Sequence, residues 1–225
     1  TGYRQMERLR YIQNRRHWCW AVACRMAGEQ YKKQHAGYGF SIIGDRSAGH
    51  GYVTEYEYEN GVVTDDPEGI NWSLQRPGKI RVDAWQRAIV MNANTGKYTG
   101  YDGDVDGDDE AKIRGIRYYL TGNIYSDSVE IETLGSCDAA VSLWDKYRDR
   151  LLESAGRQEY LIGNAVMHGG RAYHTFVILC ITGEKVMLYD TADGGVSYCT
   201  ADETFRRGFE SGSGRGIVKW VQRIL

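Results

Sequence analysis

The chain has 225 residues, of which 42% are hydrophobic and 26% charged, enough for one globular domain or two closely joined lobes. Its 28 Lys and Arg nearly balance its 30 Asp and Glu, so the composition excludes a strongly basic nucleic-acid-binding protein. No apolar stretch approaches the roughly 18 residues that a membrane-spanning helix requires.

The balanced charge and the lack of a long apolar stretch predict a protein with no nucleic-acid partner and no membrane partner. The chain begins at Thr1 rather than Met, so we expect a preceding segment to have been removed, and no signal segment opens the sequence. We expect a soluble protein, secreted or delivered as an effector. No oligomeric state follows from the sequence.

The first half of the chain predicts two helices and a hairpin. Apolar residues at helical spacing predict a helix over 19–33. Residues 52–59 alternate between polar and apolar, and Asn60-Gly61 then predicts a tight turn into a second strand at 62–64. A capping-box pattern at Asp83 predicts a helix over 83–91.

The middle of the chain predicts a loop, two helices and a strand. Residues 92–109 are rich in Gly and Asp and are typical of an exposed loop. A helix over 111–120 is ended by Gly122-Asn123, and residues 128–134 alternate as a strand does. Ser136 is then the predicted cap of a helix that runs through Ser154.

The last third predicts strands. Three short apolar runs at 160–167, 173–181 and 185–189 are joined by short turns, which predicts an antiparallel meander. A Ser/Gly-rich segment at 211–216 reads as a flexible loop before a last strand at 217–224. Helices early and strands late favour an α+β architecture with two lobes.

Cys19 opens the first predicted helix, and Gln13 precedes it by six residues. A thiol at a helix N-terminus lies near unpaired N–H groups and the positive end of the helix dipole, which favour its thiolate. The amide of Gln13 can donate an N–H to an oxyanion that forms beside this sulfur. Most free cysteines simply pack, however, so the hypothesis of a nucleophile depends on a partner histidine.

His174 is the histidine embedded in an apolar strand, and it follows a glycine turn. At that place an imidazole can take the proton from Cys19. Asp190 ends the next strand, and the ends of adjacent antiparallel strands lie side by side. Asp190 can therefore orient the imidazole, as the third member of a catalytic triad does.

The order Gln13, Cys19-Trp20-Ala21, strand-borne His174 and Asp190 resembles the papain-like cysteine peptidases. It is most similar to the compact bacterial branch that includes bacteriocin-leader peptidases and AvrRpt2-like effector peptidases. The resemblance covers residues 8–45 and 111–192. It implies Cys19 as nucleophile, His174 as general base and acid, Asp190 as orienting residue and Gln13 as oxyanion donor.

The resemblance also implies a fold: a helical lobe packed against a bent antiparallel sheet, with a cleft between them. The whole chain, 1–225, would then be a single peptidase domain in two lobes, with an inserted or variable region at 45–110. The Cys-Gly lead-in of the lysosomal members is absent before Cys19, and Asp190 stands where papain itself has an asparagine. Both departures favour the bacterial branch.

Several residues compete for these roles. His168 ends the strand opposite His174 and is the rival base, whereas His17 is better explained as a surface residue. Asp190 can instead be an ordinary turn residue, with Asp193 as the fallback. Gln13 can be an ordinary surface glutamine, because only its spacing to Cys19 supports its role.

Other patterns favour plain structural roles. An odd number of cysteines leaves at least one thiol free, and Cys24, Cys180 and Cys199 are better explained as packed residues. The segment that begins at Asp102 has the first ligands of a calcium-binding loop, Asp102, Asp104 and Asp106. Ile113, however, stands where such a loop requires a bidentate glutamate. We expect a solvated acidic loop there, with a weak calcium site as the alternative, and otherwise no metal and no cofactor.

The favoured hypothesis is a cysteine endopeptidase that cleaves a peptide or protein substrate through a thioester acyl-enzyme. Two alternatives remain open. The first is another acyl-transfer enzyme, such as a glutamine deamidase or a crosslinking transferase, because the same thioester serves these reactions. The second is a non-catalytic papain-like binding module.

Overall fold

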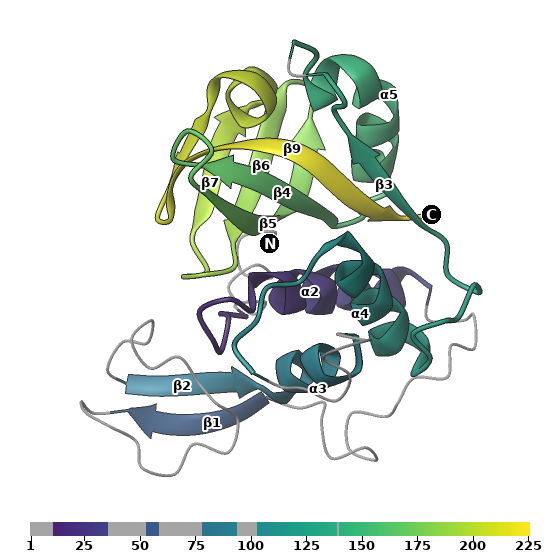
Figure 1. Cartoon of the computed structure of the whole chain (residues 1–225), viewed down its shortest axis with the longest axis vertical. Coiled ribbons are helices and arrows are strands. Elements are labelled where there is room, and N and C mark those ends of the chain that lie inside the picture. Colours follow the sequence, from purple (N-terminus) through teal and green to yellow (C-terminus); the bar gives the residue numbers. More distant parts are fainter. Residues whose placement is uncertain (1–10, 36–52, 59–77, 94–102, 139) are drawn as a thin grey trace.

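Helices and an antiparallel sheet form two layers, one above the other in Figure 1. The structure is a computed structural model, and it describes residues 11–35, 53–58, 78–93, 103–138 and 140–225. The α+β class expected from the sequence is confirmed. Among the helices of these ranges, none has the length and apolarity needed to cross a membrane.

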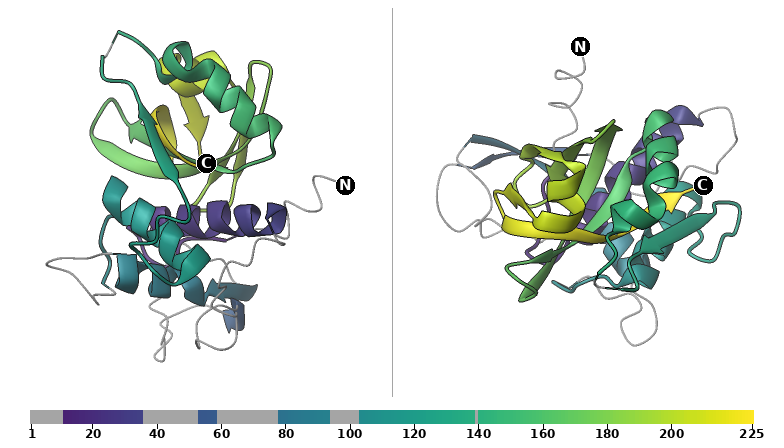
Figure 2. Two further views of the ribbon diagram at one scale, coloured as in Figure 1. Left: turned by 90° about the vertical axis from the view of Figure 1, so that its right-hand side faces the viewer. Right: turned by 90° about the horizontal axis from the view of Figure 1, so that it is seen from above.

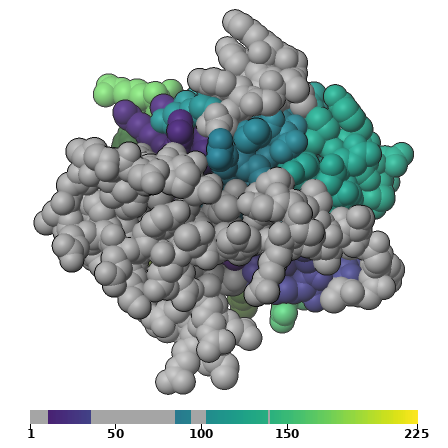
Figure 3. Space-filling model, turned by 90° about the horizontal axis from the view of Figure 1, so that it is seen from below, coloured from purple at the N-terminus to yellow at the C-terminus, as the bar shows by residue number. Residues whose placement is uncertain are grey.

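The helical layer contains α2 (Cys19–Gln34), α3 (Ala84–Ala93) and α4 (Asp109–Thr121). All three helices were predicted, and every boundary lies within two residues of the prediction. The carboxylate of Asp108 caps α4 by accepting the N–H of Ala111, and Gly122 ends the helix in the left-handed conformation. Figure 3 shows the described residues of α3 beside those of the segment that contains α4, on the face seen from below.

A two-stranded ribbon immediately precedes α3 along the chain, and its pairing is one that the sequence did not predict. The strand β1 (Val53–Tyr58) forms as expected, but it pairs antiparallel with β2 (Gly78–Asp83). Asn60-Gly61 and 62–64 lie outside the described residues. Ile80 and Val82 alternate with polar residues in the sequence, which is the strand signal that pattern reading passed over.

The main sheet has seven strands and is antiparallel throughout. The predicted meander is confirmed as β4, β5 and β6, and β7 extends it, while β9 inserts between β3 and β4. The strands are β3 (Ile131–Gly135), β4 (Leu161–Met167), β5 (Ala172–Thr182), β6 (Lys185–Asp190), β7 (Val196–Thr200), β8 (Phe209–Ser211) and β9 (Gly214–Ile224). The register shifts between Asn164 and Ala165 and again between Ile178 and Cys180, and such irregularities bend a sheet.

Two further predictions about the second half were wrong. The helix α5 (Leu143–Gly156) begins later than expected, because Ser142 caps it by accepting the N–H of Asp145, while Ser136 binds the carbonyl of Asp138. Residues 211–216, expected to be a flexible loop, form the turn and the start of the β8–β9 hairpin. The short π-helical turn η3 (Glu203–Arg207) was not predicted.

Hydrophobic residues of the sheet are buried on both faces. On β5, Val177 and Leu179 join the core shared with the helical layer, whereas Phe176 and Ile178 join the core shared with α5. This alternation explains why β5 reads as a continuous apolar run. In Figure 2, α2 runs beneath the sheet while α5 covers the sheet on another side.

Candidate active site

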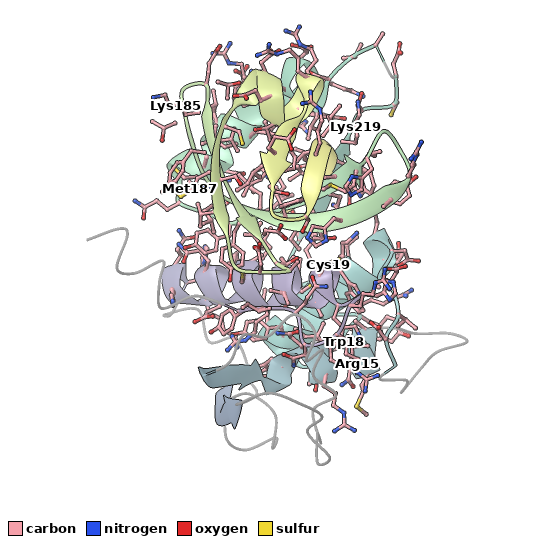
Figure 4. All side chains as sticks on the ribbon, turned by 90° about the vertical axis from the view of Figure 1, so that its left-hand side faces the viewer. Arg15, Trp18, Cys19, Lys185, Met187 and Lys219 are labelled. Atoms are coloured by element: carbon pink, nitrogen blue, oxygen red, sulfur yellow. The ribbon has the colours of Figure 1, made fainter. Side chains whose placement is uncertain are left out.

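Cys19 is the first residue of α2, directly beneath the sheet (Figure 4). The cap residue Trp18 makes no side-chain hydrogen bond to the helix. The first N–H groups of a helix have no partner within it, and they carry the positive end of the dipole. The helix start therefore favours a negative charge on the half-buried sulfur.

A short loop at 103–108 holds the residues on either side of Cys19. The indole N–H of Trp18 donates to the carbonyl of Gly103 at 2.9 Å, and that of Trp20 donates to the carbonyl of Val105 at 3.0 Å. Between them, the carboxylate of Asp104 accepts the backbone N–H of His17 at 2.7 Å. These three hydrogen bonds fix the chain that enters α2.

Gly107 lets this loop approach the helix closely. A Cβ at position 107 would lie 2.2 Å from Cδ2 of the Trp20 ring, a distance that no side chain tolerates. The same loop supplies Asp108 as the cap of α4. The acidic segment is thus part of the framework around Cys19 rather than only a solvated loop.

The predicted alternative of a weak calcium site falls partly outside the described residues. Asp102 lies outside the described residues, Asp104 is bound to His17, and Asp108 caps α4. Within the described ranges, no group of three or more His, Cys, Asp or Glu side chains is arranged to hold a metal ion.

His174 and Asp190 are joined by a hydrogen bond between β5 and β6. Nε2 of His174 lies 2.7 Å from Oδ1 of Asp190, and the side chains are 13% and 3% exposed. Asp190 pairs with Phe176 across the sheet, so His174 is its diagonal neighbour on the same face. The ring of Phe176 packs edge-on against the imidazole, with centroids 4.7 Å apart. Strand register alone therefore brings the two groups together.

The carboxylate of Asp190 accepts two more hydrogen bonds. The backbone N–H of Ala192 donates to Oδ1 at 3.0 Å, and the hydroxyl of Ser213 donates to Oδ2 at 2.6 Å. Asp190 is buried, and each of its carboxylate oxygens has a donor. Sequence reasoning missed Ser213, because the only signal was a Ser/Gly-rich stretch.

Charges at the site support one another. Burial opposes the thiolate of Cys19, but the hydrogen bond and charge of His174 outweigh it and lower the pKa of the thiol. Burial also opposes the imidazolium, but hydrogen bonds with Asp190 and Cys19 raise the pKa of His174 to about 9. For Asp190, bonds from His174 and Ser213 overcome burial and hold its pKa below the ordinary value. This arrangement favours a thiolate–imidazolium pair.

Thr175, next to His174, is a further contact of the Cys19 sulfur that sequence reasoning missed. Its hydrogen bonds to the sulfur also lower the pKa of the thiol. The hydroxyl of Thr175 lies 3.3 Å from Oδ1 of buried Asn164, which in turn donates to Gln222 at 2.5 Å. A buried polar network thus supports the strand that carries His174.

Gln13 lies close to the residue that follows Asp190. Its backbone N–H donates to the carbonyl of Thr191 at 2.9 Å, and its side-chain oxygen accepts the Thr191 hydroxyl at 3.4 Å. Its amide nitrogen donates to the carbonyl of Arg16 at 2.6 Å, which uses one of the two amide hydrogens. Gln13 is not among the described residues that line the groove, so its role as an oxyanion donor stays a prediction.

The rival residues have other partners. His168 lies in a turn with a φ of 51° and packs its ring against Gly214, whereas His17 pairs with Asp104. Asp193 accepts the N–H of Gly195 at 2.7 Å. Cys24 is buried and donates to the carbonyl of Lys112, and burial raises the pKa of Cys24 to about 12. Of the histidines among the described residues, only His174 is hydrogen-bonded to Asp190.

Cys19 and His174 line a groove of about 1660 Å³. Residues of the helical layer and residues of the sheet both contribute to its walls, and Figure 4 shows Lys219 above Cys19. Its charged lining residues, besides histidines, are Asp104, Asp106, Asp108, Asp109, Asp138, Lys112, Arg114 and Lys219. The groove is large enough for an extended peptide rather than a small molecule alone.

Comparisons of the chain with protein-family models, with curated proteins and with solved structures gave no match.

Proposed function

We propose that the protein is a cysteine peptidase of the papain-like kind, which cleaves peptide bonds through a thioester intermediate. One observation carries the proposal: Cys19 begins a helix and lines one groove with His174, whose Nε2 is bound to buried Asp190 at 2.7 Å and whose charge lowers the pKa of the Cys19 thiol. A nucleophile, a base and an orienting group in this order are the parts that acyl transfer requires.

The ring nitrogens of His174 have separate tasks in this proposal. Since an ionised carboxylate only accepts hydrogen bonds, Nε2 carries the proton toward Asp190. Nδ1 then exchanges a proton with the sulfur of Cys19. The raised pKa of His174 keeps the imidazole protonated at neutral pH, ready to protonate a leaving amine.

In the proposed reaction, the thiolate of Cys19 attacks the carbonyl carbon of the scissile bond. The resulting oxyanion is stabilised by the backbone N–H of Cys19 and by the second amide hydrogen of Gln13. His174 gives its proton to the amine as the C–N bond breaks. It then takes a proton from water, whose oxygen displaces the thiolate and releases the acid.

The papain-like assignment and the polypeptide substrate are part of this proposal. Support comes from a nucleophile on a helix, a base on an antiparallel sheet and a groove lined by both. Deamidation or crosslinking of a protein glutamine would use the same groups up to the thioester, and a binding module would use the groove alone.

The decisive experiment incubates the protein with a denatured protein mixture and maps new termini by mass spectrometry. Cys19→Ala and His174→Ala test the machinery, and Cys180→Ala, a half-buried cysteine on β5, is the matched control. We expect cleavage by the wild type and by Cys180→Ala, and none by the other two variants.

Three outcomes would contradict the proposal. Cleavage by Cys19→Ala would exclude the nucleophile. Ammonia release without new termini would favour the deamidase. If iodoacetamide modifies Cys19 no faster than an ordinary thiol and no substrate is changed, the protein is a binding module.

A further inference from the structure

The β8–β9 hairpin carries a hydroxyl to the side of Asp190 that faces away from His174. Oδ1 of Asp190 accepts hydrogen bonds from His174 and from the N–H of Ala192. Oδ2 accepts the hydroxyl of Ser213 at 2.6 Å. Ser213 lies 23 residues further along the chain, so the contact depends on where the hairpin turn lies in space.

The turn is built to hold Ser213 in this place. The hydroxyl of Ser211 donates to the carbonyl of Gly214 at 2.9 Å and accepts the N–H of Ser213 at 3.2 Å. Gly214 has a φ of 107°, in the region that favours glycine, and a Cβ there would lie 2.3 Å from the His168 ring. These restraints leave the backbone of the turn little freedom.

The neighbouring glycine makes a second close approach. A Cβ at Gly212 would lie 2.1 Å from Oδ2 of Asp193. The loop after β6, which contains Asp193, and the turn after β4, which contains His168, therefore both pack against the hairpin. A hydroxyl held this firmly is presented to Asp190 before any substrate binds.

The geometry determines what the hydroxyl does. With donors on Oδ1 alone, the carboxylate could turn about its Cβ–Cγ bond and lose its alignment with Nε2 of His174. A donor on Oδ2 fixes the plane of the carboxylate. It also stabilises the negative charge, because hydrogen bonds to the ionised form of a buried acid favour that form.

We infer that Ser213 is a positioning residue of the active site, which holds the Asp190 carboxylate in line with His174. This inference rests on the proposed function. It extends the series of interacting residues to four: Cys19, His174, Asp190 and Ser213. Ser213 does not touch the reacting atoms. It acts through Asp190 on the orientation and proton affinity of the imidazole.

The test compares Ser213→Ala with Ser213→Thr, which keeps the hydroxyl, and with Ser128→Ala, an exposed serine, as control. We expect Ser213→Ala to lower kcat by roughly tenfold or more while KM changes little, because a hydrogen bond to a charged group is lost. Ser213→Thr should recover most of the loss, and Ser128→Ala should match the wild type.

A second readout needs no substrate. The ultraviolet absorbance of the Cys19 thiolate, followed against pH, should show that the thiolate–imidazolium pair of Ser213→Ala forms at higher pH than that of the wild type. Cys19→Ala supplies the baseline, and circular dichroism checks that each variant is folded.

The outcomes separate the two proposals. Unchanged thiolate titration and unchanged kcat in folded Ser213→Ala would overturn the role of Ser213 while leaving the peptidase intact. A wild type that cleaves nothing would overturn the peptidase, and the thiolate titration would still decide whether Ser213 positions Asp190. A fall in kcat that Ser213→Thr does not recover, with the titration unchanged, would reduce Ser213 to a packing residue.

Discussion

Replacing Asp190 with asparagine removes one negative charge and should leave the shape of the site in place. Asparagine keeps an oxygen for Nε2 of His174 and for the N–H of Ala192, which both bind Oδ1. Its amide group would face Ser213, whose hydroxyl can turn and accept a hydrogen bond. Asp190→Asn therefore tests the charge of the orienting group rather than its presence.

The size of the effect follows from the buried bond between Asp190 and His174. Burial lowers the pKa of His174, but its bonds with Asp190 and Cys19 raise it to about 9, so the imidazolium persists below that pH. A hydrogen bond between charged groups contributes about 1.5–3 kcal/mol, which corresponds to roughly one to two pH units. Without the carboxylate charge, we expect the imidazolium to lose its proton at a pH that is lower by this amount.

The assay is the pH dependence of kcat/KM on a peptide substrate identified by terminus mapping. In the wild type the basic limb lies near pH 9, where His174 loses its proton. In Asp190→Asn this limb should fall by about one to two pH units. The acid limb should rise, because a weaker imidazolium stabilises the Cys19 thiolate less. If both limbs stay where they are in folded Asp190→Asn, the charge of Asp190 does not set the proton affinity of His174.

Two further predictions concern the helix that carries the nucleophile. Helix propensity alone favours Gly28→Ala by about 1 kcal/mol, but the new Cβ would lie 2.3 Å from the Tyr119 ring. We therefore expect urea unfolding to show a loss of about 1–3 kcal/mol, whereas a gain would contradict the packing of α2 on α4. Iodoacetamide at neutral pH should label Cys19 and spare Cys24, because burial raises the pKa of Cys24 to about 12. Equal labelling in peptide maps would contradict the difference between the two thiols.

The places of Cys19, His174 and Asp190 in the fold could be predicted because each depends on local order in the sequence. Cys19 is defined by the start of one helix, and His174 and Asp190 by two consecutive strands with a short turn. Strand alternation places residues two apart on one face, so a register set by a short turn also determines the diagonal pair. Each of these steps uses contacts between neighbours in the sequence, which patterns report well.

The residues that support Cys19 and Asp190 could not be predicted in the same way. Gly107 and its loop hold Trp20 from more than eighty residues away, and the insertion of β9 beside β4 brings Ser213 to Asp190. Both segments are rich in Gly with Asp or Ser, a composition that pattern reading assigns to exposed loops. The same small residues also permit close approach of two backbones, and composition does not separate these uses.

The sequence alone could not decide whether His174 or His168 is the base. Both lie on the β4–β5 hairpin, and choosing the wrong one of its two strands exchanges their roles. His174 lies within β5, where alternation fixes its face, while His168 takes a left-handed conformation in the turn. His168 and Asp193 pack on Gly214 and Gly212, the glycines beside Ser213, so these two rival candidates support the hairpin whose Ser213 binds Asp190. Residues near one end of β4, β5 and β6 thus reach different places because their backbone conformations differ, a property that residue type alone does not determine.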